Sequence, residues 1–279
     1  MVADLGPTTG VVALALHGDA PMAVAVDGAT DGALHPFTAL ARDAARRAGH
    51  PDAGRVHLAD APAASLAGRE AAAAAGARLG IDAQHPDGHP DGADAAQAIA
   101  LRSACAALQA APLPPHPHVV AAALTGQPHT VTHRYPPQVT ALPARAWWVA
   151  VVDPALDAPA RGWAQLAPRT IDTRKAIGAA RLLTGWLDAW SRGDAAQLLA
   201  CSDDRIHDHA VLPHIPGAHP ARNAALAAGA CTVGLANRGA ALAAIAPDAT
   251  TARAAADAMA DAWAAHRIDT SITIGPLSP

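Results

Sequence analysis

The chain has 279 residues, a length that suits one large domain or two fused lobes. Of these residues 51% are hydrophobic but only 3% are aromatic, so the core must be built from small side chains, alanine above all. A formal net charge of −4 excludes a basic stripe for a nucleic-acid backbone, and no apolar run approaches the roughly 18 residues of a membrane span. We therefore expect a cytoplasmic protein that binds neither nucleic acid nor a membrane.

The three cysteines predict reduced thiols. Cys105, Cys201 and Cys231 are an odd number at unrelated spacings, which fits neither a disulfide framework nor a zinc site.

In the first half of the chain, short apolar runs alternate with helical patterns. The predicted strands lie at 11–18, 22–28 and 54–60, and the predicted helices at 36–49, 66–80 and 94–110. We expect the first two strands to pair across the turn between them. A duplicated turn, HPDGHPDG at 85–92, contains His85, Asp87, His89 and Asp91, which could bind a metal. The sequence Pro-Asp-Gly is, however, primarily typical of turns.

The second half resumes with a buried strand after the prolines near residue 136. The predicted strands lie at 144–154, within 229–247 as a strand–turn–strand unit, and at 269–275, and the predicted helices at 173–194, 194–212 and 251–266. The first two helices are expected to form an antiparallel pair. The Trp147–Trp148 pair should point to opposite faces of its strand, and Trp186 and Trp190 to one face of their helix. The pattern is α+β, with two lobes at 1–140 and 141–279.

Four segments, in order, match a known family pattern at several positions each. They are ADLGPTTGVVALAL (3–16), DAPAASLAGREAAAAAG (60–76), PPHPHVVAAALTG (114–126) and GACTVGLANRGAALAAI (229–245). The third is the most specific, because it shares His116, Pro117, Val120, Leu124 and Gly126 with the pattern E-G-H-P-D-N-V-A-A-A-L-x-G. With these segments the chain resembles the homoserine kinases of the GHMP small-molecule kinase superfamily. The resemblance implies a GHMP kinase-like two-lobe α+β fold, with an N-terminal lobe like ribosomal protein S5, a ferredoxin-like C-terminal lobe and a dimeric assembly.

The residues that the family uses for phosphoryl transfer are replaced in this sequence. Arg69 and Glu70 stand where the family's phosphate loop has paired serines, and His118 stands where the family has a carboxylate next to the substrate and metal. Phosphoryl transfer needs backbone amides around the phosphates and oxygen ligands for magnesium. The sequence therefore predicts that ATP-dependent phosphotransfer is lost, with no cofactor and no metal required.

The resemblance also implies a cleft for nucleotide and substrate, and the residues that would border it here are polar side chains that suit acid–base chemistry. Histidine transfers protons near neutral pH, and arginine stabilises carboxylates or enolates through paired N–H donors. We expect His118, His116 and Glu70 to be catalytic in an elimination, isomerisation or cyclisation of a small polar or carboxylate-bearing metabolite of specialised metabolism. The expected substrate-binding residues are Arg69, Arg181, His207, Thr8, Thr9, Asn237 and Arg238.

Other interpretations of these residues stay open. His116 and His118 could cap a helix, Arg69 and Glu70 could form a solvated pair, and the acidic and histidine residues at 203–209 could be a metal site or a wet helix face. At the level of function, the alternatives are a non-catalytic protein that binds a small molecule or partner, and a divergent homoserine kinase.

Overall fold

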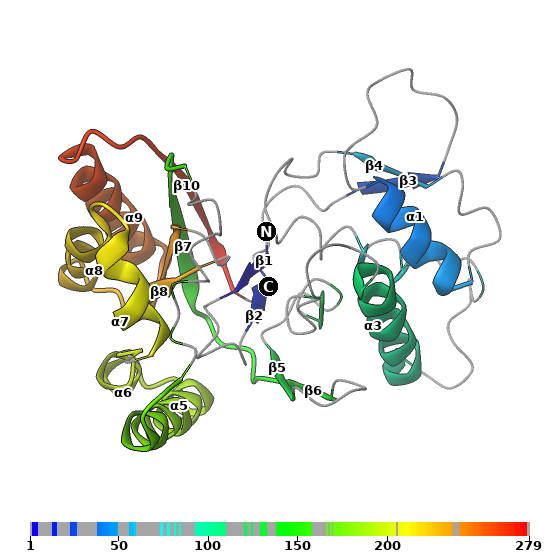
Figure 1. Ribbon diagram of the computed structural model, residues 1–279, viewed down its shortest axis with the longest axis horizontal. Helices are drawn as coiled ribbons and strands as arrows, with labels where there is room; N and C mark the ends of the chain where they lie inside the picture. Colours follow the sequence, from blue (N-terminus) through cyan, green and yellow to red (C-terminus); the bar gives the residue numbers. More distant parts are fainter. Residues whose placement is uncertain are drawn as a thin grey trace.

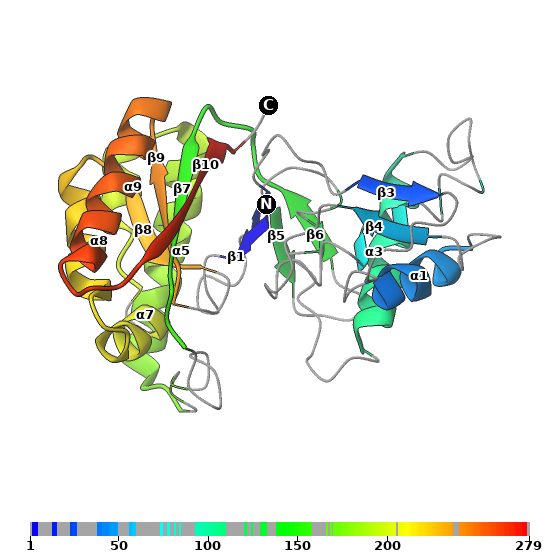
Figure 2. The same cartoon turned by 90° about the horizontal axis from the view of Figure 1, so that it is seen from above.

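The computed structural model shows a mixed helix and antiparallel-sheet protein in two halves (Figures 1 and 2). Helices α5 to α9 and strands β7 to β10 make one half; α1, α3, β3 and β4 lie at the opposite end of the molecule. The structure describes residues 2–4, 13–15, 23–26, 38–49, 56–59, 73–74, 77–78, 81, 84, 93–109, 120–121, 124, 129–132, 138–157, 166, 168, 170–204, 206–236 and 240–277.

A four-stranded antiparallel sheet forms the centre of the C-terminal half. Its strands are β7 (Trp148–Pro154), β8 (Thr232–Leu235), β9 (Leu242–Ala246) and β10 (Thr270–Pro276), in the order β10-β7-β9-β8. Helices α5 to α8 lie between β7 and β8 along the chain, and α9 lies between β9 and β10. Because α8 and α9 pack together on one face of the sheet, the lobe has the βαββαβ arrangement expected for a ferredoxin-like lobe.

Helices cover both faces of this sheet. They are α5 (Thr173–Arg192), α6 (Ala195–Ala200), α7 (His207–Val211), α8 (Ala218–Ala227) and α9 (Ala249–Ala264). Because successive strand residues point to opposite faces, β7 contributes to two cores: Ala150 and Val152 pack with α8 and α9, while Val149 and Val151 pack with α5. Alanine fills much of both cores, which lets the helices approach the sheet closely.

The tryptophan predictions are confirmed by this two-sided packing. Trp147 is buried in the core below α5, whereas Trp148 is half-buried and packs against the core below α8 and α9. Trp186 and Trp190 share one face of α5, where their rings stack with centroids 5.2 Å apart.

The first half holds two smaller sheets and a separate alanine-rich core. Strands β1 (Val2–Asp4), β2 (Ala13–Ala15), β5 (His129–Thr132) and β6 (Gln138–Ala141) form one antiparallel sheet; β3 (Ala23–Val26) and β4 (Val56–Ala59) form the other. Helices α1 (Thr38–Arg47) and α3 (Ala93–Gln109) pack together at the core, with Ala44 and Leu108 fully buried between them. The expected helix at 66–80 is borne out at its described residues 73, 74, 77 and 78.

Two predictions about the elements are wrong. The strands at 11–18 and 22–28 do not pair: β2 pairs with β1 and β5, and β3 pairs with β4. Neighbours along the chain are partners in only about two-thirds of cases, and nothing local to a strand identifies its partner. The expected helix at 194–212 is two helices in the structure, because α6 ends at Ala200 and α7 begins only at His207.

Several elements were not expected from the sequence at all. Strands β1, β5 and β6 are three or four residues long, too short for a clear alternating pattern, and α8 was not predicted. Within the described residues, no helix is both long and apolar enough to cross a membrane.

Candidate functional site

The break between α6 and α7 builds the most distinctive polar cluster of the described residues. The Asp204 carboxylate accepts hydrogen bonds from the backbone N–H groups of Ile206 (2.8 Å) and His207 (2.9 Å). An aspartate in this position satisfies amides that would otherwise lack partners at a helix start, so the chain begins a new short helix here. This turn brings Asp204, His207 and Asp208 together.

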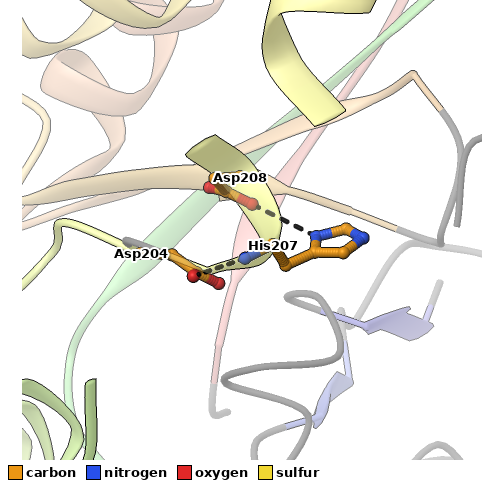
Figure 3. A group of neighbouring side chains, drawn as sticks. All are labelled: Asp204, His207 and Asp208. Carbon is orange, nitrogen blue, oxygen red and sulfur yellow. Dashed lines mark hydrogen bonds and ion pairs between the residues drawn. The ribbon is translucent and has the colours of Figure 1, made fainter. Parts of the chain in front are cut away.

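The three residues lie close together: a ring nitrogen of His207 faces Asp208, and the Asp204 carboxylate lies at the backbone amide of His207 (Figure 3). Their nearest ligand-type atoms all lie within 4.8 Å of one another, and the His207 Nδ1 atom is 3.5 Å from Asp208 Oδ1. His207 and Asp208 are 1% and 5% exposed, so both are withdrawn from water. The other carboxylate oxygen of Asp208 accepts a long hydrogen bond, 3.4 Å, from the Leu235 amide of β8.

Three atoms of this cluster are buried without a hydrogen-bond partner: both ring nitrogens of His207, and Asp208 Oδ1. The 3.5 Å approach of Nδ1 to Oδ1 is close enough for an ion pair but lacks hydrogen-bond geometry. A buried polar group without a partner costs about 1–3 kcal/mol of folding free energy, so this arrangement destabilises the folded protein.

The electrostatics of the cluster disfavour two neighbouring charged carboxylates. Burial, and then the negative charge of Asp208, raise the pKa of the Asp204 carboxyl above its ordinary value. The hydrogen bonds from the Ile206 and His207 amides act in the opposite direction but do not cancel the first two effects.

A cavity of about 50 Å³ lies against the carboxylate side of the cluster. Its walls are the inner face of α5, the chain between α6 and α7, and β8 with its neighbour β9. Apolar groups from α5 make one wall and polar groups make another. The lining residues include Leu182, Leu183, Trp186, Asp204, Asp208 and Thr232.

The structure describes two of the ten predicted site residues. His207 is buried, which excludes the wet-face interpretation for it and for Asp208, while the neighbouring Asp203 and His209 are exposed. Arg181 is exposed on the outer face of α5, beside Ile177 and Thr184, and does not line the cavity next to Asp208. The two residues therefore do not share one cavity, and their substrate-binding roles stay predictions.

The other eight predicted site residues lie outside the described residues. They are Thr8, Thr9, Arg69, Glu70, His116, His118, Asn237 and Arg238. The same holds for the turn at 85–92.

Sequence reasoning left the acidic and histidine residues at 203–209 open between a metal site and a solvent-exposed helix face, and it did not include Asp204 and Asp208 among the expected site residues. A signal for Asp204 was present: an aspartate two and three residues before the amides it binds is typical of a helix start. The burial of Asp208 left no such signal, because it depends on β8 lying beside α7.

Comparison with solved structures shows the fold of the whole chain. A homoserine kinase from Cytophaga hutchinsonii matches with a TM-score of 0.72 at 19% identity, over 96% of this chain and 90% of that one. Mevalonate kinase from L. major, solved with R-mevalonate, matches with a TM-score of 0.65 at 13% identity, over 100% of this chain and 94% of that one. Streptococcus pneumoniae phosphomevalonate kinase, solved with phosphomevalonate and AMPPNP, matches at 0.59 and 11%, over 99% and 97%.

No protein-family model and no curated protein matches the sequence. The similarities to solved structures nevertheless cover nearly the entire chain. The protein therefore has the GHMP kinase fold, of the α+β class, and its structural relatives include a homoserine kinase.

Proposed function

We propose that this protein keeps the scaffold of a homoserine kinase but does not transfer phosphate from ATP. The observation that carries the proposal is the chemistry of the positions that resemble the phosphate loop and the metal-binding segment. Arg69 and Glu70 replace paired serines, and His118 replaces a carboxylate. Glu70 would place a negative charge beside an anionic phosphate, and two like charges about 4 Å apart near a protein surface repel by roughly 4 kcal/mol.

In this proposal the protein is an ATP-independent acid–base enzyme, such as a lyase, isomerase or cyclase, of specialised metabolism. His118 and His116 exchange protons with a small polar metabolite, Glu70 supplies a second acid–base group, and Arg69 and Arg181 bind the substrate's negative charge. The folded, well-packed C-terminal half supports this proposal over that of a decayed chain, because its cores and helix caps are intact. We also propose that it works in the cytoplasm as a homodimer.

Calorimetric titration of the full-length protein with ATP and magnesium tests the loss of phosphotransfer. We expect no saturable heat up to millimolar nucleotide, because the residues at the family's magnesium positions offer few oxygen ligands. A micromolar dissociation constant, together with ADP release in the presence of homoserine, would instead establish a divergent kinase.

The acid–base role is tested by His118→Ala in an assay of candidate metabolites. We expect turnover to fall by at least a hundredfold with unchanged circular dichroism, in keeping with the usual contribution of a general acid or base. The exposed His209→Ala is the matched control and should keep full turnover. A protein that binds the metabolite without converting it would support the non-catalytic alternative.

A further inference from the structure

We infer that Asp204, His207 and Asp208 form a binding site for a first-row divalent transition metal, with Zn²⁺ as the best-suited ion. Its three residues are not among those of the family's magnesium–nucleotide pattern, and the inference does not depend on the proposed reaction. It departs from the expectation that the protein needs no metal.

The strongest evidence is the unsatisfied buried imidazole. His207 is 1% exposed, and neither ring nitrogen has a hydrogen-bond partner. In a neutral imidazole one nitrogen donates and the other accepts, and in the charged form both donate, so every protonation state leaves polar atoms unsatisfied here. Ligation of an ion by Nδ1 removes one of these defects, and ligation by Asp208 Oδ1, which also lacks a hydrogen bond, removes another.

The spacing of these two atoms fits a common ion. Zinc binds nitrogen and oxygen ligands at about 2.0–2.2 Å, and tetrahedral bond angles then place adjacent ligand atoms roughly 3.4 Å apart. His207 Nδ1 and Asp208 Oδ1 are 3.5 Å apart, and Figure 3 shows the imidazole nitrogen facing the Asp208 carboxylate. An oxygen of the Asp204 carboxylate lies within 4.8 Å of a ligand atom of each partner, so a shift of at most about 1.4 Å brings it to the same ion.

The charge and composition of the cluster also favour a dication. Two neighbouring carboxylates, that of Asp208 buried and that of Asp204 partly buried, repel each other, and an ion of charge +2 between them replaces that repulsion with attraction. One imidazole with two carboxylates suits Zn²⁺, Mn²⁺ or Fe²⁺ better than Mg²⁺, because magnesium prefers all-oxygen ligands. The adjoining cavity of about 50 Å³ has room for the few water molecules that would complete the coordination shell.

The chain offers matched controls for a binding experiment. His207→Gln and Asp208→Asn remove buried ligands, whereas His209→Gln and Asp257→Asn make the same chemical changes at exposed positions that do not line the cavity. Calorimetric titration of ZnCl₂ into the chelator-treated full-length proteins should give one ion per wild-type chain. The first two variants should bind at least tenfold more weakly, and the control pair should stay within about twofold of wild type.

Two results would overturn the inference. One is the absence of saturable Zn²⁺ binding to the wild-type protein. The other is equal affinity in all five proteins, which would place the ion elsewhere, for instance on His85 and His89. If the ligand variants fail to fold, X-ray absorption of the zinc-loaded wild-type protein decides: one imidazole with oxygen ligands supports the site, and a shell with no imidazole, or with sulfur, contradicts it.

Discussion

Trp190 is the largest side chain that is fully buried in the core between α5 and the sheet. Its ring stacks on Trp186 and lies 6.3 Å from that of Trp147, and its indole Nε1 donates a 3.0 Å hydrogen bond to the Pro143 carbonyl. In a chain with so few aromatic residues, these three tryptophans fill a volume that would otherwise need many small side chains. They also fix the segment before β7 against the end of α5.

Trp190→Ala should lower the free energy of unfolding by about 3–5 kcal/mol, because it leaves a large cavity in a packed core. Trp190→Phe keeps most of the apolar contact and loses the hydrogen bond, so a smaller loss is expected. Urea unfolding followed by circular dichroism measures both. Equal losses in the two variants would show that the hydrogen bond, and not the packing, carries the effect.

Gly217 and Gly193 share a left-handed backbone conformation but differ in their surroundings. Their φ angles are +75° and +72°. A Cβ at Gly217 would lie 2.8 Å from Trp263 Cδ1, whereas at Gly193 the nearest atoms belong to the Arg145 side chain at 3.9 Å. The backbone cost of alanine is therefore similar at both sites, and only Gly217 adds a steric clash with a buried ring.

Gly193→Ala should cost about 1–2 kcal/mol of unfolding free energy, the usual penalty for an L-residue in this conformation. Gly217→Ala should cost clearly more, since Trp263 is fully buried and has little space to move. Thermal unfolding of the two variants side by side provides the comparison. Similar melting temperatures for both would mean that Trp263 adapts to the added methyl group.

Among the elements, α9 depends on a charged residue at its start. The Asp248 carboxylate accepts hydrogen bonds from the backbone N–H of Thr251 (2.8 Å) and from its hydroxyl (3.0 Å). These two hydrogen bonds hold the pKa of Asp248 below its ordinary value, and the bond from the backbone N–H has the larger effect. A lowered pKa in the folded state means that the charged form stabilises the fold.

This stabilisation should be complete above the unfolded-state pKa of about 3.9 and should disappear as the pH falls through the lower folded-state value. Asp248→Asn keeps a side-chain acceptor for the cap but cannot titrate, so its unfolding free energy should depend less on pH below 4 than that of wild type. Unfolding measured from pH 6 to pH 2 tests this. Asp257→Asn, on an exposed position of the same helix, controls for a general change in charge.

At the scale of the whole molecule, each hydrophobic core is drawn from one half of the chain. Among the described residues, the two cores that flank the β10-β7-β9-β8 sheet contain only residues from Leu142 to Leu277, and the core around α1 and α3 contains only residues from Leu40 to Leu124. The division into lobes near residue 140 remains a prediction, and the composition of the cores favours it.

A fragment of residues 141–279 should therefore fold alone, with both of its cores complete. We expect a cooperative thermal transition and a near-ultraviolet circular dichroism signal from its tryptophans. Loss of that signal, with secondary structure retained, would show that the N-terminal half is needed to pack the sheet.

The sequence by itself determined most of the regular elements of the C-terminal half. Periodicity located α5, α9 and β10, because this signal depends on neighbours along the chain. In the structure Asp172 and Gly193 bound α5, and Asp248 begins α9. The α+β class and the GHMP kinase-like fold were also predicted correctly, on motifs retained in the right order.

Only the tertiary structure decided the strand partners and the composition of the buried cluster. β2 pairs with β1, and β3 pairs with β4, instead of pairing with each other. This choice depends on contacts between residues far apart in the chain, which no local sequence pattern records. The burial of His207 and Asp208 likewise depends on how α7 lies against β8, whose Leu235 amide binds Asp208. The sequence alone leaves this segment open between a metal site and a solvent-exposed helix face, and the packing around it excludes the exposed face for His207 and Asp208 by burying both.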